Sequence, residues 1–161
     1  MRSEEDANRA VDLYGDTARR ICMIHLKNMA DTEDIFQTVF LKYVLRTAPF
    51  DNPEHEKAWI IRVTANACKD LLKSFFRTRT VSPETMIERS HEIPEDHSDV
   101  LEAVLALPEK YKDPIYLHYY EGYTAEEIGQ ILHKNTNTVY TLLTRARQML
   151  KTWLEGVTED E

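Results

Sequence analysis

The sequence predicts an all-α protein made of two small helical domains joined by a flexible acidic linker. Apolar residues recur three and four positions apart over most of the chain, which is the spacing of one helix face. The chain has only four glycines among its 161 residues and no alternating β-branched run. A polar, acidic stretch with two prolines separates two helical blocks. We therefore expect domains at 1–78 and 100–155, a linker at 79–99 and an acidic tail at 156–161.

Three helices are predicted in the first domain. An apolar stripe predicts a helix over 5–28, and Asp31 or Thr32 is placed to cap a second helix. Residues 48–56 hold two prolines and no periodicity, which predicts a loop. The third helix is expected over 56–76. The stripe that would face the core from the second helix is Ile35, Phe36, Val39, Phe40, Tyr43 and Val44.

The second domain has the pattern of a helix-turn-helix preceded by further helices. A helix is predicted from near Val100, and Pro108 is placed to open the next one, which stops at 121–122. Thr124 with Glu127 forms a capping box for a helix over 125–132. After a turn, Asn135 or Thr136 would cap a last helix that runs to about Leu154.

The net charge of −8 is unevenly distributed along the chain. Residues 1–90 are neutral overall, so the excess of acid lies in residues 91–161, largely in the linker and the tail. Residues 124–153 have four basic and two acidic side chains. The acidic total therefore does not argue against nucleic-acid binding by the last helices.

No pattern of a catalytic, cofactor or metal site is present. The chain has no HExxH, P-loop, GxGxxG or GxSxG sequence, so we expect no enzyme activity and no cofactor. Cys22 and Cys68 lie in apolar stripes and are predicted to be core residues. His91 and His97 lie in the acidic linker, where a solvated segment is expected rather than a metal site. No apolar run approaches the roughly 20 residues of a membrane span, so we expect a cytoplasmic protein without membrane insertion.

Two helix faces are candidates for binding nucleic acid. On the third predicted helix, cations and an Asn share one stripe, which Trp59 begins; the alternative is a solvated face, and spacing alone leaves both open. On the last helix, hydrogen-bonding side chains would point outward, although an ordinary helical hairpin remains the alternative. The outward residues there are Asn137, Thr138, Tyr140, Thr141, Thr144 and Arg145.

Four segments together resemble the extracytoplasmic-function (ECF) sigma factors, a branch of the primary sigma family of bacterial transcription initiation factors. DTEDIFQTVFLKYV is similar to region 2.2, and AWIIRVTANACKDLLKSF is similar to regions 2.3–2.4. ALPEKYKDPIYLHYYEGYTAEEIGQIL resembles region 4.1 and the first helix of region 4.2. TVYTLLTRARQML resembles the recognition helix that follows. Each motif is loose alone, but four in the right order are specific.

The resemblance implies a factor that binds core RNA polymerase, through the β′ clamp helices and the β flap, and directs it to promoter DNA. It implies that the polymerase contacts come from Asp34, Gln37, Phe40 and Lys42. It implies contact with the minus-ten element by the loop 48–56 and by Asn52, Trp59, Arg62, Asn66, Lys69, Asp70 and Lys73. It implies contact with the minus-thirty-five element by Lys134, Asn135, Asn137, Thr138, Tyr140, Thr141, Thr144, Arg145 and Arg147. An anti-sigma factor is an expected further partner.

The chain departs from the family pattern around the last two helices. The family usually has Gly in the turn, where this chain has His133, and Ala where this chain has Gly129. The common Lys after Thr-Val is Tyr140, and a frequent Arg is Leu142. The predicted recognition helix therefore depends more on hydrogen bonds than on charge.

Three other functions are alternatives to a promoter-specificity factor. A sigma-like protein could bind an anti-sigma factor without recognising DNA, although the retained polar stripe on the third helix argues against this. A dimeric helix-turn-helix repressor would leave the segment from Asp34 to Gln37 unexplained. An enzyme is the least supported alternative.

Overall fold

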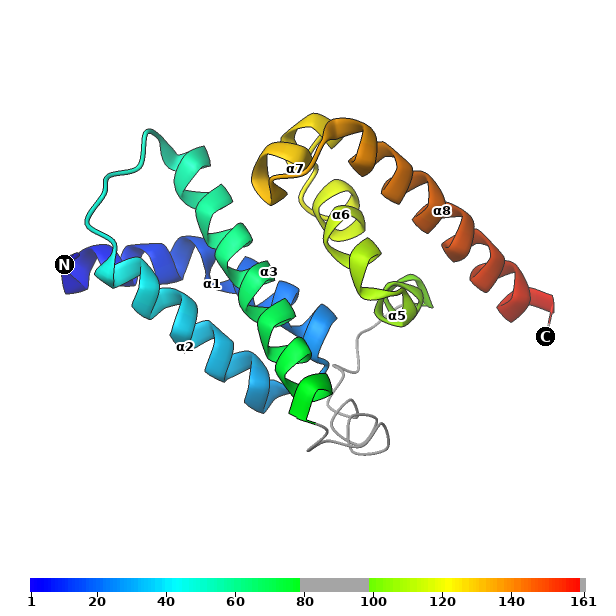
Figure 1. Cartoon of the computed structure of the whole chain (residues 1–161), viewed down its shortest axis with the longest axis horizontal. Coiled ribbons are helices and arrows are strands. Elements are labelled where there is room, and N and C mark those ends of the chain that lie inside the picture. Colours follow the sequence, from blue (N-terminus) through cyan, green and yellow to red (C-terminus); the bar gives the residue numbers. More distant parts are fainter. Residues whose placement is uncertain (79–98, 160–161) are drawn as a thin grey trace. The chain divides into compact units, whose positions relative to one another are not determined.

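A computed structural model describes residues 1–78 and 99–159 (Figure 1). The described residues form helices, turns and short loops without a strand, and they group into two separate compact units. The all-α prediction is therefore confirmed. The predicted linker, apart from its last residue, lies outside the described residues, as do His91 and His97. No helix in the described ranges has the length and apolar character to span a bilayer.

The first unit is a three-helix bundle of α1 (Glu4–Leu26), α2 (Met29–Leu45) and α3 (Pro53–Thr78). Each helix packs against the other two, and Figure 1 shows them side by side. Cys22 and Cys68 are both buried in the shared core, as expected. The large side chains of this core are Tyr14, Leu26, Ile35, Phe36, Val39, Phe40, Tyr43, Trp59, Ile60 and Leu72.

The turn between α1 and α2 is tighter than the sequence suggested. Lys27 ends α1 in the left-handed region with φ 62°, and Asn28 returns to extended backbone. Asn28 Oδ1 then accepts a hydrogen bond of 2.8 Å from the backbone N–H of Asp31. The helix cap is therefore Asn28, and the expectation of a cap at Asp31 or Thr32 is wrong.

The loop before α3 is shorter than predicted. Helix α3 already begins at Pro53, so the last four residues of the expected loop 48–56 form its first turn. Asn52 Oδ1 accepts a hydrogen bond of 2.8 Å from the backbone N–H of His55 and acts as the cap. Proline fits directly after a cap because its missing N–H would have no helical partner there.

The second unit contains α5 (Asp99–Ala106), α6 (Glu109–Tyr119), α7 (Ala125–Leu132) and α8 (Thr136–Glu159). Figure 1 shows α7 and α8 joined by a tight turn. Both halves of the predicted capping box are present: Glu127 N–H donates to Thr124 Oγ1 at 3.1 Å, and Thr124 N–H donates to Glu127 at 3.0 Å. Helix α8 continues to Glu159, beyond the end expected near Leu154, so much of the expected tail is helical.

Candidate nucleic-acid interface

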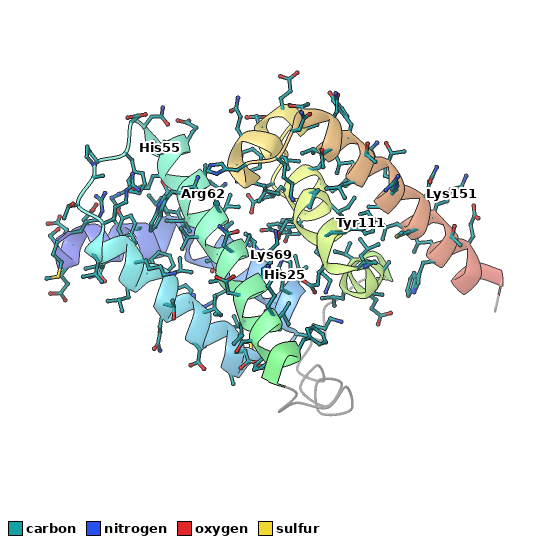
Figure 2. All side chains as sticks on the ribbon, viewed as in Figure 1. His25, His55, Arg62, Lys69, Tyr111 and Lys151 are labelled. Atoms are coloured by element: carbon teal, nitrogen blue, oxygen red, sulfur yellow. The ribbon has the colours of Figure 1, made fainter. Side chains whose placement is uncertain are left out.

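The polar stripe of α3 lies largely at the surface. Asn66, Asp70 and Lys73 are exposed, and Arg62 and Lys69 are partly buried. Figure 2 shows Arg62 and Lys69 on α3. Their spacing of three and four places these side chains along one side of the helix, which offers cations for phosphates and an amide for bases.

Trp59 does not belong to this surface. It is 8% exposed, and its ring centroid lies 6.3 Å from that of Tyr43 and 5.7 Å from that of Phe50. The expectation that Trp59 begins the polar stripe is therefore wrong. Because α3 packs on both α1 and α2, its buried arc is wider than the apolar stripe alone. Trp59 instead packs against Phe50 of the loop before α3.

That loop, residues 46–52, is held by aromatic stacking. The Phe50 ring lies nearly parallel to the Tyr43 ring, at 8° and 6.1 Å between centroids, and meets Trp59 edge-on. The guanidinium of Arg2 lies 4.9 Å from the Phe50 ring, and that of Arg46 lies 4.5 Å from it. Such cation–π contacts each stabilise by about 0.5–1 kcal/mol or more.

Hydrogen bonds also fix the same loop at Ala48 and at its C-terminal end. The carbonyl of Ala48 accepts from Arg2 at 3.0 Å and from Arg46 at 3.2 Å. The backbone N–H of Asp51 donates to His55 Nδ1 at 3.0 Å. Asn52, expected to contact DNA, is exposed, but its side-chain oxygen caps α3. Its role in this structure is to set where the loop ends and the helix begins.

A partly buried polar network lies beside the loop and ties the three helices together. Arg9 of α1 donates to both carboxylate oxygens of Glu56, at 3.1 and 2.8 Å. The Tyr43 hydroxyl lies 3.0 Å from Glu56 and 3.1 Å from Asp6. Burial raises the pKa of Glu56, but hydrogen bonds from Arg9 and Tyr43 outweigh it and hold that pKa below its ordinary value.

The second candidate surface is the outward face of α8. All six residues predicted to point outward are exposed, and the buried residues of the same helix include Val139, Leu142, Leu143 and Ala146. Lys134 is also exposed in the turn. Asn135 is exposed, but its Oδ1 accepts from the backbone N–H of Asn137 at 2.8 Å, so it caps α8. The helix start is thus fixed by the residue that precedes it.

Arg147 behaves differently from Arg145. Its Nε donates to the Tyr119 hydroxyl of α6, and its Nη2 lies 3.4 Å from His118 Nε2. His118 Nδ1 lies 2.8 Å from the Tyr123 carbonyl, which leaves Nε2 as the acceptor for Arg147 when the proton is on Nδ1. Arg147 therefore links α8 to α6 in this structure, whereas Arg145 is exposed on the outward face.

The turn between α7 and α8 explains one departure from the family pattern. His133 has φ 55°, a conformation in which Gly is favoured. A Cβ built on Gly129 would lie 2.7 Å from the Lys134 carbonyl oxygen, so the turn packs closer to α7 than an Ala would allow. This chain therefore has His133 in the turn, where the family usually has Gly, and it has Gly129 in α7, where the absence of a Cβ lets the turn approach the helix closely.

We expect Gly129→Ala to destabilise the second unit by about 1–3 kcal/mol, since overpacking outweighs the roughly 1 kcal/mol gained in helix propensity. Gly156→Ala in α8 is the matched control, because a Cβ there meets nothing within 4 Å. The control should be neutral or slightly stabilising. Thermal unfolding monitored by circular dichroism measures both, and equal melting temperatures for the two variants would contradict the crowding at Gly129.

A third surface lies on α2. Asp34, Gln37 and Lys42 are exposed, as a contact with another protein requires. Phe40 is not available for such a contact, because it is buried with its ring centroid 4.7 Å from that of Phe36. The expectation that Phe40 contacts the polymerase directly is therefore wrong: it belongs to the core of the first unit.

The same face of α2 carries two residues that the sequence reasoning missed. Leu41 and Leu45 are 59% and 58% exposed, one helical turn apart and on the side of Asp34 and Gln37. Their position outside the apolar stripe was the signal that could have identified them. An exposed apolar pair next to charged residues is typical of a protein-binding surface.

Among the described residues, no group of three or more His, Cys, Asp or Glu side chains is placed to hold a metal ion.

Comparisons with known proteins agree with the two-unit organisation. The family model described as Sigma-70 region 2 matches residues 10–78, and that described as Sigma-70, region 4 matches residues 97–150. The chain is 34% identical over 135 residues to the RNA polymerase sigma factor SigV of Bacillus subtilis, covering 82% of this chain and 81% of that protein. It is 27% identical to the ECF RNA polymerase sigma factor SigW of the same organism, covering 91% of this chain and 88% of SigW.

Solved structures share the fold. The sigma factor RpoE in complex with the anti-sigma factor NepR from Bartonella quintana matches with a TM-score of 0.74 and 18% identity, over 94% of this chain and 98% of that one. CnrH in complex with the cytosolic domain of CnrY matches with a TM-score of 0.68 and 18% identity, over 96% and 90%.

Proposed function

The chain belongs to the extracytoplasmic-function sigma factors of the sigma-70 family, and we propose that it binds core RNA polymerase and directs it to specific promoters. The observation that carries this proposal is the exposed face of α8, whose amide, hydroxyl and guanidinium groups can bond to base edges in a major groove. The protein is a transcription factor rather than an enzyme, and it acts in the cytoplasm with the polymerase.

Each surface has a part in this function. The outward face of α8 contacts the duplex minus-thirty-five element, with Asn137 able to bond adenine in a bidentate manner and Arg145 able to bond guanine or phosphate. The loop 46–52 and the polar stripe of α3 contact the minus-ten element as a single strand, where unstacked bases need new stacking and phosphate partners. The outer face of α2, with Asp34, Gln37 and Lys42, contacts the β′ clamp helices.

A protein partner that covers these surfaces would regulate the activity. One solved structure with this fold is a sigma factor in complex with an anti-sigma factor, and another is CnrH in complex with the cytosolic domain of CnrY. We propose that an anti-sigma factor binds this chain as well. The alternative is a sigma-like protein that binds an anti-sigma factor without recognising DNA. Such a protein would start no transcript, so a transcription assay distinguishes it from a promoter-directing sigma factor.

The test is run-off transcription with core polymerase on fragments of the source genome, with and without this protein. We expect new discrete transcripts that Asn66→Ala weakens and Arg145→Ala reduces by roughly tenfold, as for loss of one base or phosphate contact. Lys151→Ala is the matched control on α8: its side chain is 77% exposed and lies nearly two turns further along the helix. Binding to core without any transcript would favour the anti-sigma-binding alternative, and no binding to core would overturn the proposal.

A further inference from the structure

The guanidinium group of Arg2 connects the N-terminal end of α1 to the loop 46–52. Its Nη1 donates to Asp6 at 3.2 Å, and its Nη2 donates to the carbonyl of Ala48 at 3.0 Å. Between these bonds, its guanidinium lies 4.8 Å from the Tyr43 ring centroid and 4.9 Å from that of Phe50. The backbone N–H of Arg2 also donates to Val44 at the end of α2, at 2.9 Å.

Apart from Arg2, the loop is attached by the Phe50 ring, which packs on Tyr43 and Trp59, and by the hydrogen bond from the Asp51 N–H to His55. Arg46 reaches the same Ala48 carbonyl at 3.2 Å, but it directly follows α2, whereas Arg2 precedes α1 and so adds a link from the loop to a different helix. Arg2 links the Ala48 carbonyl to Asp6 of the polar network, and its guanidinium lies over the Tyr43 and Phe50 rings, which also stack on one another. A planar guanidinium suits this task because it stacks on rings and donates in its own plane at once.

We propose that Arg2 is a positioning residue for promoter recognition: it holds the loop 46–52 in the shape that contacts the minus-ten strand. This inference rests on the proposed function of that loop. Residue 2 lies outside the segment matched by the region 2 family model, which begins at residue 10.

The alternative is that Arg2 simply neutralises a DNA phosphate. Its side chain is only 18% exposed and both ends of its fork are already bonded within the protein. A lost phosphate contact weakens binding about equally for all sequences and lowers the salt dependence, whereas a displaced loop loses the distinction between bases. The two roles therefore predict different measurements.

The first measurement follows the loop without any DNA. The chain has only two tryptophans, so Trp153→Phe leaves Trp59, which lies against Phe50, as the reporter. In that background we expect Arg2→Ala to raise the acrylamide quenching constant of Trp59 about twofold, because the covering loop opens locally. Arg19→Ala is the matched control: Arg19 pairs with Glu33 at 3.0 Å and lies 3.9 Å from the Phe36 ring centroid, the same kinds of contact away from the loop.

The second measurement uses the holoenzyme and fork-junction DNA that carries the minus-ten strand of a promoter found by run-off transcription. Each base of that strand is replaced in turn by an abasic site, and the ratio of affinities for intact and abasic DNA gives the discrimination. We expect Arg2→Ala to lower the largest of these ratios about tenfold, with an unchanged salt slope. Arg2→Lys keeps the charge but not the planar fork, and it should restore only part of the discrimination.

The outcomes separate the inference from the function on which it rests. A wild-type holoenzyme that is indifferent to every abasic site would overturn the proposed role of the loop together with this inference. Wild-type discrimination that Arg2→Ala retains, or a uniform loss of affinity with a smaller salt slope, would overturn this inference alone. Unchanged quenching of Trp59 in Arg2→Ala would also overturn it, because the loop would then keep its place without Arg2.

Discussion

Replacing Leu41 and Leu45 together by Asp is expected to abolish binding to core RNA polymerase at concentrations where the wild-type chain is saturated. Both side chains are more than half exposed on α2, beside the exposed Asp34 and Gln37. Burying a leucine in an interface stabilises it by about 1.5–3 kcal/mol, and burying an unpaired carboxylate there instead costs several kcal/mol more. Together these effects exceed a hundredfold loss in affinity, since each 1.4 kcal/mol is about tenfold.

The matched control is Leu13→Asp on α1. Leu13 is 58% exposed, so the substitution adds one carboxylate, against two in the double variant, at a site of the same exposure on another helix. Fluorescence anisotropy of labelled protein titrated with core polymerase measures each affinity, and circular dichroism verifies the helical fold. We expect the control to bind within a few-fold of wild type. An equal loss in the Leu13 variant, or retained binding by the double variant, would show that the outer face of α2 is not the polymerase contact.

Glu56→Ala is expected to destabilise the first unit by about 2–4 kcal/mol, because the buried Tyr43 hydroxyl and the Arg9 guanidinium lose their shared acceptor. The loss of stability is no larger because Arg9 is 45% exposed, so water can replace the carboxylate as its hydrogen-bond partner. For a unit of this size the melting temperature should fall by about 10 °C or more. Unfolding followed through Trp59 fluorescence in the Trp153→Phe background measures this unit alone.

The same carboxylate gives stability a defined pH dependence. The pKa of Glu56 in the folded chain lies below its ordinary value of 4.5. Its contribution is therefore fully present above the unfolded pKa and is lost as the pH falls through the folded pKa. Glu56→Gln should flatten the dependence of the unfolding free energy on pH below about pH 5. Glu54→Gln, an exposed carboxylate in the same helical turn, is the control, and a pH dependence unaltered by Glu56→Gln would contradict the linkage.

The sequence by itself determined the helices, several of their ends and the outward face of the recognition helix. Side-chain spacing of three and four is a local property, and so is a capping box: Thr124 and Glu127 bond to backbone groups within a single turn. The outward residues of α8 followed from the same periodicity, because Val139, Leu143 and Ala146 can face only one side of the helix.

Only the tertiary structure decided which aromatic side chains are buried and which contacts hold the loop before α3. The resemblance implied contacts with DNA for Trp59 and with the polymerase for Phe40, yet both side chains lie in the core formed by α1, α2 and α3. The contacts that fix the loop join residues distant in the chain, such as Arg2 with Ala48 and Arg9 with Glu56. Periodicity predicts the side of its own helix on which a residue lies. Its burial and its ion pairs depend on which residues of the neighbouring helices pack against it.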